Sequence, residues 1–292
     1  MAGGSQVDMT DSQSRVDLHA HSTASDGEMT PAELIRYALE RGLTTIALTD
    51  HDTCAGIDAA LAAAQNTKLQ VIPGVELSCD VSKTEVHVLG YFIDWHDEYF
   101  ESMLVKFRDG RFGRAEKMVK KLNALGLNIS FERVKEIAGD ASIGRPHVAQ
   151  ALLAGGQIET VTEAFDKYIG RNGPAYVERF RLTPEDAVAL ILRAGGVPVL
   201  AHPREVTDWI FPLVKSGLVG LEVHYGMYDD LTRQELHRLA RQYGLIATGG
   251  SDFHGLKKMA HMCALGDTYV PPDVVDKLKA KAQEIKATYK QQ

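Results

Sequence analysis

The sequence predicts an α/β fold that is built on a parallel sheet and interrupted by a helical insertion. Strand and helix patterns alternate over residues 16–75, as expected when crossover helices join parallel strands. Residues 98–180 then read as helices with no strong strand pattern between them, which is typical of an inserted unit. Because the alternation resumes after Thr183, one α/β unit is expected on both sides of the insertion.

The first elements are defined by clear start and stop signals. A strand is expected at residues 16–21. Thr30, Pro31 and Glu33 predict a capped helix start. Gly42 predicts where that helix ends. The other elements expected before the insertion are strands at residues 45–49, 69–75 and 85–92 and a helix at residues 57–64.

The same start and stop signals predict the elements of the insertion and of the second α/β part. Helices are expected in the insertion at residues 99–125, 131–138, 145–153 and 161–169. Thr183 and Pro184 predict another capped helix start. Beyond it, the expected elements are strands at residues 197–201, 220–224, 245–248 and 268–270 and a charged helix from Asp273. The predicted organisation is a disordered polar leader, a first α/β part, the helical insertion and a second α/β part, at residues 1–14, 15–97, 98–180 and 181–292.

Composition and charge exclude several classes of protein. With 292 residues, of which 45% are hydrophobic, the chain can bury a large core. The net charge of −7 argues against broad nucleic-acid affinity, so stable binding to duplexes is not expected. No apolar run approaches the roughly 20 residues that span a bilayer, so no membrane partner is expected. The three cysteines form no Cys-x-x-Cys motif, which favours a reducing cytoplasm over a disulfide framework.

Two histidines close the first expected strand. His19 and His21 are two residues apart, so on a strand both imidazoles point to the same face. At a strand end the pair could bind one metal, since neutral imidazole is the commonest metal ligand. The motif alone is weak evidence, because a buried structural pair of histidines has the same spacing.

Later strand ends supply further residues of the types that bind metals. They are His51, Glu76, His87, His202, Asp252 and His254, together with Asp26 in the first loop. In a parallel barrel the C-terminal ends of the strands form one rim, where these side chains would meet. A single histidine at a strand end is more often a hydrogen-bonding residue than a ligand. The coincidence of the whole set favours a metal cluster.

The chemistry of this set indicates which metals it suits. Imidazole and carboxylate ligands without thiolate suit Zn²⁺, Mn²⁺ or Fe²⁺ rather than Ca²⁺. The nine candidates exceed what one ion can use, so two or three divalent metals are expected. Glu76 is the best bridge between them, because a carboxylate has two oxygens to offer.

The order and spacing of these motifs resemble those of a known family. The motifs are Asp17-Leu-His-Ala-His-Ser22, Thr49-Asp-His-Asp52, Gly74-Val-Glu76, His87, Ala201-His-Pro203 and Ser251-Asp-Phe-His254. They are similar to the successive motifs of the PHP (polymerase and histidinol phosphatase) superfamily, over residues 15–270. The insertion, with Ile143-Gly-Arg-Pro-His147, resembles the branch that dephosphorylates 3′,5′-nucleoside bisphosphates. Some members of that branch also trim short RNA from the 5′ end.

The resemblance implies a distorted (β/α)7 barrel with an inserted helical lid and up to three metals. The implied ligand sets are His19, His21, Glu76 and Asp252 for one metal, Glu76, His87 and His202 for a second, and Asp26, His51 and His254 for a third. Many superfamily members carry histidine where this chain has Asp26. That substitution exchanges a neutral ligand for an anionic one.

The reaction that the resemblance implies is hydrolysis of a phosphomonoester, from a 3′,5′-nucleoside bisphosphate to a nucleoside 5′-monophosphate and phosphate. Clustered metals lower the pKa of bound water, so a metal-bound hydroxide is the expected nucleophile, supported by Asp252, His254 and Arg204. Arg204 also directly follows a ligand motif and is expected to bind substrate. Arg145 and His147, at the start of an insertion helix, are expected to bind the second phosphate.

Other functions of the same residues stay open at this point. Composition does not separate a nucleotide from histidinol phosphate or a sugar phosphate; only the insertion does. An amidohydrolase-type metallohydrolase shares the barrel and the His-x-His motif, but no lysine occurs at a barrel strand end. A non-catalytic module that kept the fold would show eroded ligands, whereas every expected position is filled. The roles of Arg111, Arg114 and His224 are not readable from the sequence.

Overall fold

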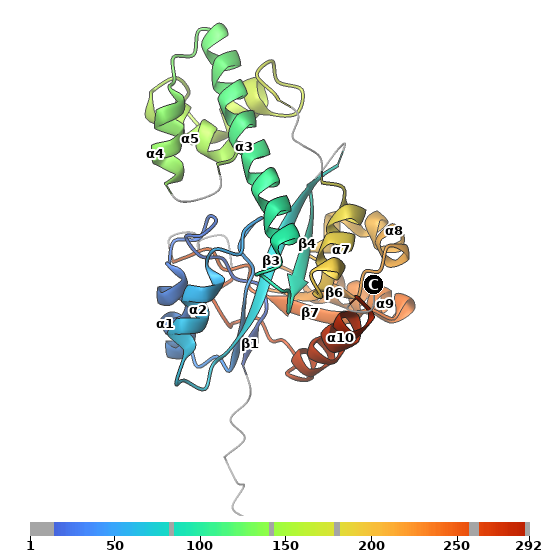
Figure 1. Ribbon diagram of the computed structural model, residues 1–292. Helices are drawn as coiled ribbons and strands as arrows, with labels where there is room; N and C mark the ends of the chain where they lie inside the picture. The colour runs from blue at the N-terminus through green and yellow to red at the C-terminus, as the bar shows by residue number, and fades with distance from the viewer. Residues whose placement is uncertain (1–14, 82–84, 140–142, 178–181, 257–262, 290–292) are drawn as a thin grey trace, which may run out of the picture.

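The computed structural model describes residues 15–81, 85–139, 143–177, 182–256 and 263–289 of the chain (Figure 1). The predicted leader, residues 1–14, lies outside these ranges. One sheet of seven strands follows the order of the sequence. The strands are β1 (Val16–Asp17), β2 (Thr45–Leu48), β3 (Gln70–Asp80), β4 (Glu85–Tyr91), β5 (Val197–Leu200), β6 (Gly220–Tyr225) and β7 (Ile246–Gly250).

The sheet curls until its first and last strands meet. The Leu18 N–H donates to the carbonyl of Gly249 at 3.2 Å, and Ala20 pairs with Phe253 just beyond β7. These contacts close most of the remaining edge, which would otherwise expose unpaired backbone groups. The predicted seven-stranded α/β barrel is therefore confirmed.

One strand runs against the direction of the others. β4 runs antiparallel to both β3 and β5, whereas the other neighbouring strands are parallel. The reason is the short connection between β3 and β4, since a parallel return requires a crossover of a dozen residues or more. The parallel pattern predicted from the first three strands is confirmed for β1, β2 and β3, and β4 is the strand at which the barrel departs from it.

The reversed strand changes where two predicted ligands lie. β3 continues to Asp80, beyond its predicted end at residue 75, because β4 pairs along it from Gly74 onward. Glu76 therefore lies within a strand and not at its end. β4 begins at the rim where its antiparallel neighbours β3 and β5 end, so His87, close to the start of β4, lies at that rim too.

Helices surround the barrel (Figure 1). They are α1 (Pro31–Glu40), α2 (Ile57–Ala64), α7 (Pro184–Arg193), α8 (Ile210–Lys215), α9 (Asp230–Tyr243) and α10 (Asp273–Tyr289), with a 3₁₀ segment η2 (Pro203–Trp209). Successive side chains along a strand point to opposite faces of the sheet, so they pack in two different cores. Ile46 and Leu48 pack among residues of the helices around the sheet, whereas Ala47 belongs to the cluster that contains the apolar side of α10.

Two sequence predictions have clear outcomes in these helices. The capping box of α1 is present, because Thr30 Oγ1 accepts from the Glu33 N–H and the Glu33 carboxylate accepts from the Thr30 N–H. The strand predicted at residues 268–270 is absent. The contacts between the ends of β7 and β1 occupy most of the edge there, so little of it is left for another strand to pair with.

The insertion has a hydrophobic core of its own. Its helices are α3 (Glu98–Ala124), α4 (Phe131–Ala138), α5 (Arg145–Ala154), α6 (Val161–Ala164) and the π-helical turn η1 (Phe165–Ile169). Leu122, Val134 and Leu152 belong to this separate cluster, whereas Phe100 and Leu104 at the start of α3 pack with the barrel. One long helix therefore carries the insertion on the barrel. The second half of α3 and the helices from α4 to η1 are called the cap below; the division at residues 98 and 180 stays a prediction.

Gly250, the last residue of β7, leaves no room for a side chain. A Cβ added there would lie 2.5 Å from the N and Cβ atoms of His19. Because these atoms are fixed by the first strand, we expect Gly250→Ala to lower the free energy of unfolding by about 1–3 kcal/mol.

The matched control is Gly113→Ala in α3, where an added Cβ would meet no atom within 4 Å. This change should raise the free energy of unfolding by about 0.5–1 kcal/mol, because alanine favours helix. Denaturant unfolding measures both variants. Equal stability of the Gly250→Ala variant and the unaltered protein would contradict this account of the barrel closure.

Candidate metal centre

A buried carboxylate lies at the centre of the predicted ligands. Glu76 is 1% exposed, and five histidine rings surround its two oxygens. Its Oε2 lies 3.2–3.3 Å from ring nitrogens of His19, His21 and His51. Its Oε1 lies 2.9–3.2 Å from ring nitrogens of His87 and His202. The two oxygens therefore face two different groups of imidazoles.

The structure brings all nine predicted ligands into one cluster. Three overlapping groups could each hold an ion, because the ligand atoms within a group lie within 4.8 Å of one another. The groups are His19, His21, Glu76 and Asp252; His21, Asp26, His51 and His254; and His51, Glu76 and His87. The first group equals one predicted ligand set, and the second contains another. His202 belongs to none of the three, although it lies beside Glu76. Coordination by each residue stays a prediction.

Local backbone conformation directs several of these side chains. The rings of His19 and His21 lie 5.2 Å apart, as expected for two residues on one face of an extended segment. His202 and Asp252 follow the ends of β5 and β7 and have φ values of 26° and 55°. Such positive φ values are uncommon outside glycine. Backbone strain of this kind is typical of functional sites.

Glu222 is a buried carboxylate that the sequence analysis did not identify. It is fully buried in β6, where it lies 2.9 Å from His19 Nδ1 and accepts the backbone N–H of His202 at 2.8 Å. A carboxylate can only accept, so Nδ1 of His19 carries the proton and Nε2 keeps a lone pair directed at Glu76. The sequence did carry a signal for this buried role, because Glu222 is a charged residue within the otherwise apolar strand pattern Gly220-Leu-Glu-Val.

Further polar contacts hold the ligands from behind. The buried carboxylate of Asp17 accepts backbone N–H groups of His19, Ser251 and Gly266 at 2.8–3.2 Å, so it joins the first strand to the segment that carries Asp252. The Tyr225 hydroxyl donates to Asp252 Oδ2 at 3.0 Å.

His224 has a different position from these residues. Its ring lies 4.8 Å from that of His237 in α9. Burial, together with the smaller effects of the neighbouring His237 and Arg233, lowers the pKa of His224 to about 4. His224 therefore packs between β6 and α9 and does not line the cavity described below.

The cluster concentrates opposite charges in a buried space. Burial by itself lowers the pKa of His21, but Asp252 and Glu76 raise it to about 10. Burial lowers the pKa of His51 to about 3. The surrounding histidines hold the pKa values of Glu76 and Asp252 well below their usual range, although burial acts in the opposite direction. The carboxylates therefore stay ionised and require positive charge beside them.

These residues fit divalent metals. The ring of His21 is fully buried, and neither of its nitrogens makes a hydrogen bond within the described part of the chain. A buried polar group without a hydrogen-bond partner is costly, and a metal would satisfy a nitrogen of this kind. Imidazole and carboxylate donors without thiolate are the set that Zn²⁺, Mn²⁺ and Fe²⁺ accept. The types of donor atom and the ionised carboxylates of the cluster therefore both fit divalent metals.

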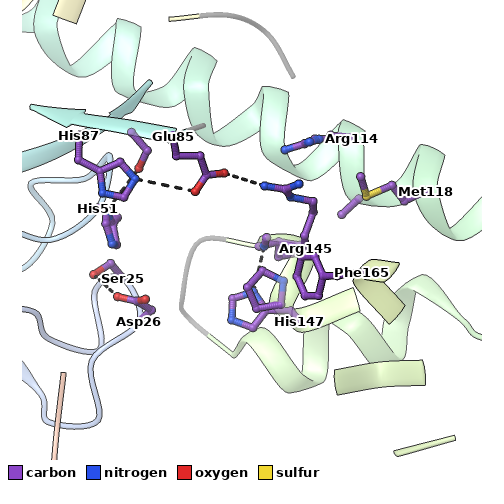
Figure 2. A pocket seen from close by; sticks show the side chains of 15 residues that line it. Ser25, Asp26, His51, Glu85, His87, Arg114, Met118, Arg145, His147 and Phe165 are labelled. Carbon is purple, nitrogen blue, oxygen red and sulfur yellow. Dashed lines mark hydrogen bonds and ion pairs between the residues drawn. The ribbon is translucent and has the colours of Figure 1, made fainter. Parts of the chain in front are cut away.

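A cavity of about 340 Å³ leads from this cluster to the cap (Figure 2). Residues from the barrel on its wall include Ser25, Asp26, His51, Ser78, Glu85 and His87. Residues from the cap include Arg114, Met118, Arg145, His147 and Phe165. Figure 2 shows Glu85 between His87 and Arg145. The cavity thus has candidate metal ligands at one end and cationic side chains at the other.

Two residues predicted to bind substrate lie at the cap end of this cavity. Arg145 begins α5, donates to Glu85 Oε1 at 2.7 Å and lies 5.7 Å from the ring centre of Phe165. His147 Nδ1 accepts the N–H of Gly144 at 2.9 Å. A ring nitrogen that accepts carries no proton, so Nε2 of the neutral ring is a donor.

The other arginines considered in the sequence have different positions. The Arg204 side chain is 56% exposed, pairs with Glu205 at 2.8 Å and is not among the residues that line the cavity; its predicted role in binding is untested. Arg114 lines the cavity and donates to the carbonyl of Val177 at 2.7 Å. The side chain of Arg111 lies outside the described part of the chain.

Comparisons with known proteins bear directly on the family. The family profile described as PHP domain matches residues 17–178. The chain belongs to the PHP domain family. It is 35% identical over 249 residues to a 3′,5′-nucleoside bisphosphate phosphatase from Chromobacterium violaceum, which covers 82% of this chain and 87% of that protein. The family predicted from the motifs is therefore confirmed.

Other PHP proteins agree on the class of enzyme. The chain is 32% identical over 268 residues to a 5′-3′ exoribonuclease from Haemophilus influenzae, covering 88% of this chain and 97% of that protein. A solved structure from Bifidobacterium adolescentis, named as a metal-dependent phosphoesterase, matches with a TM-score of 0.79 and 31% identity over 92% of this chain and 96% of that one. The predicted class, a metal-dependent phosphoesterase, is confirmed. Within the described ranges, no helix is both long and apolar enough to cross a membrane.

Glu222→Gln should weaken metal binding without removing a direct ligand. The carboxylate holds His19 and the backbone of His202, and loss of such support typically costs about 10- to 100-fold in metal affinity. Metal titration with a competing chelator measures the effect. Glu235→Gln in α9, an exposed partner of Arg238, is the matched control. The same affinity in Glu222→Gln and the control would exclude this role.

Asp26 tests the third predicted ligand set. Its Oδ1 lies 3.3 Å from His254 Nε2, so Asp26→Ala should lower the metal content by about one ion and reduce kcat more than KM, the pattern of lost transition-state stabilisation. Asp26→His, which restores the residue common in the superfamily, should keep that ion. Elemental analysis and steady-state kinetics measure both. Unchanged metal content in Asp26→Ala would remove Asp26 from the ligand set.

Proposed function

We propose that this PHP protein hydrolyses a 3′,5′-nucleoside bisphosphate to the nucleoside 5′-monophosphate and inorganic phosphate. The observation that carries the proposal is the cavity with two charged ends. At one end lie the candidate metal ligands, and at the other lie Arg145 and His147 of the cap. A small molecule with two phosphates and a sugar between them matches this distribution of charge.

The barrel end would bind the phosphate that is cleaved. Two or three divalent metals of the Mn, Zn or Fe type, held by the nine clustered residues, would neutralise that phosphate and lower the pKa of water for the attack. Glu76 offers one oxygen to each group of histidines. His254 Nδ1 lies 2.8 Å from the carbonyl of Asp252; a carbonyl only accepts, so Nδ1 is the protonated nitrogen and Nε2 faces Asp26 with its lone pair.

The cap end would bind the phosphate that is kept. Arg145 can donate two parallel hydrogen bonds to a phosphate, and Nε2–H of His147 can donate a third. Both residues lie in the first turn of α5 (Arg145–Ala154), where the helix dipole favours an anion. A sugar phosphate or histidinol phosphate has no second phosphate to occupy these donors, so both are disfavoured as substrates.

The 5′ end of a short RNA is a second candidate substrate. The exoribonuclease from Haemophilus influenzae supports it. The cavity of about 340 Å³ lies near the lower end of ligand-site volumes, which run from about 300 to 1,000 Å³. An oligoribonucleotide would therefore enter by its end only, and a duplex would not enter. The three cysteines are all free thiols, in accord with activity in a reducing cytoplasm.

Arg145→Ala tests the proposed substrate. The intact enzyme should hydrolyse a 3′,5′-bisphosphate far better than the matching 3′-monophosphate. A charged hydrogen bond contributes about 1.5–3 kcal/mol, so the variant should lose about 10- to 100-fold in kcat/KM on the bisphosphate. Hydrolysis of a generic aryl phosphate, which has only the reacting phosphate, should hardly change.

Arg133→Ala in α4 is the matched control, because Arg133 forms an exposed pair with Glu136 and is not a lining residue of the cavity. An equal loss on both substrates would place Arg145 at the reacting phosphate instead. If the intact enzyme showed no preference for the bisphosphate, the proposed substrate would be rejected, and the phosphoesterase class alone would stand.

A further inference from the structure

The arginine proposed to bind the second phosphate already has an anionic partner. Arg145 Nη2 lies 2.7 Å from Glu85 Oε1. The two residues come from different parts of the fold, since Glu85 begins β4 in the barrel and Arg145 begins α5 in the cap. Both line the cavity. The ion pair therefore joins cap to barrel across the space where substrate is proposed to bind.

Glu85 also lies close to the candidate metal ligands. Its Oε2 is 4.0 Å from His87 Nε2, while the other nitrogen of His87 faces Glu76 at 2.9 Å. Figure 2 shows the sequence His87, Glu85, Arg145 along one side of the cavity. A carboxylate at this position repels a phosphate bound at either end. It is also 45% exposed, so it has room to swing towards solvent.

We infer that Glu85 competes with the substrate for Arg145 and is displaced from it by the phosphate that the enzyme does not cleave. This inference rests on the proposed function, because it assigns the regulation of the same site. In the absence of ligand the Glu85–Arg145 pair closes the cap on the barrel. A terminal phosphate carries close to two negative charges near neutral pH and has three acceptor oxygens, so it binds a guanidinium more strongly than a carboxylate does.

The competition sets a charge requirement at the cap end of the cavity. A phosphomonoester dianion offers Arg145 more negative charge and more acceptor oxygens than the Glu85 carboxylate does, so it takes the place of Glu85. A phosphodiester has one negative charge and gains little from the exchange. Glu85 therefore sets a threshold at Arg145: only an anion that binds the guanidinium more strongly than a carboxylate does, such as a terminal phosphate, displaces it.

Glu85→Gln tests this directly, because it keeps the shape of the side chain and removes its charge. The probe is adenosine 5′-monophosphate, which carries only the phosphate assigned to Arg145, bound to the metal-loaded enzyme and followed by calorimetry. Loss of the competing ion pair and of the repulsion should tighten its binding about 3- to 10-fold. Binding of a dinucleotide with only an internal phosphodiester should tighten by less, because Glu85 repels its single charge less strongly.

The Arg145→Ala background isolates the mechanism. There Glu85→Gln should tighten binding clearly less, since the competition needs the arginine and only the repulsion is left to remove. Glu136→Gln, which neutralises an exposed glutamate of the cap paired with Arg133, should leave binding unchanged in both backgrounds. Unchanged or weaker binding of adenosine 5′-monophosphate by Glu85→Gln would overturn the inference and show that Glu85 positions Arg145. The two ideas fail separately, because the proposed function depends on the bisphosphate preference in hydrolysis and the inference on this shift in binding.

Discussion

The site depends on one buried carboxylate. Glu76 lies in the wall of the barrel at 1% exposure, and five imidazoles approach its two oxygens at 2.9–3.3 Å. An ionised carboxylate in such a place is tolerated only when positive charge compensates it. The segments after β1, β2 and β5 and the start of β4 bring these histidines to it, and Glu222 and Asp17 hold neighbouring groups from behind. The arrangement of the barrel mouth follows from this requirement for compensating charge.

The reversed fourth strand connects the cluster to the cap. Because β4 begins at the rim, His87 joins the cluster and Glu85, two residues earlier, reaches Arg145 of the cap. The long helix α3 packs on the barrel through Phe100 and Leu104 and carries the cap above the cavity. The same short stretch of β4 therefore carries a candidate metal ligand, His87, and the carboxylate that pairs with the cap, Glu85.

Much of the fold and of the cluster could be predicted because both leave local signals. Capping residues predicted the start of α1, and histidines at strand ends predicted the ligands. Contacts between distant segments left no such signal. The antiparallel direction of β4 depends on which strand it pairs with, and the role of Glu222 depends on its distance from His19. The place of Arg204 after His202 does not decide its role either. Its exposed side chain pairs with Glu205, and its role in binding substrate stays a prediction.

The central claim is that Glu76 is shared between two divalent metals. Anomalous scattering from crystals of the Mn²⁺-loaded protein tests it most directly, because it locates each ion independently of activity. We expect two peaks, one bonded to each oxygen of Glu76 at about 2.0–2.2 Å, with His19 and His21 beside the first and His87 beside the second. Metal peaks that leave the Glu76 carboxylate without a bonded ion, or a single ion bound by one oxygen, would contradict the account.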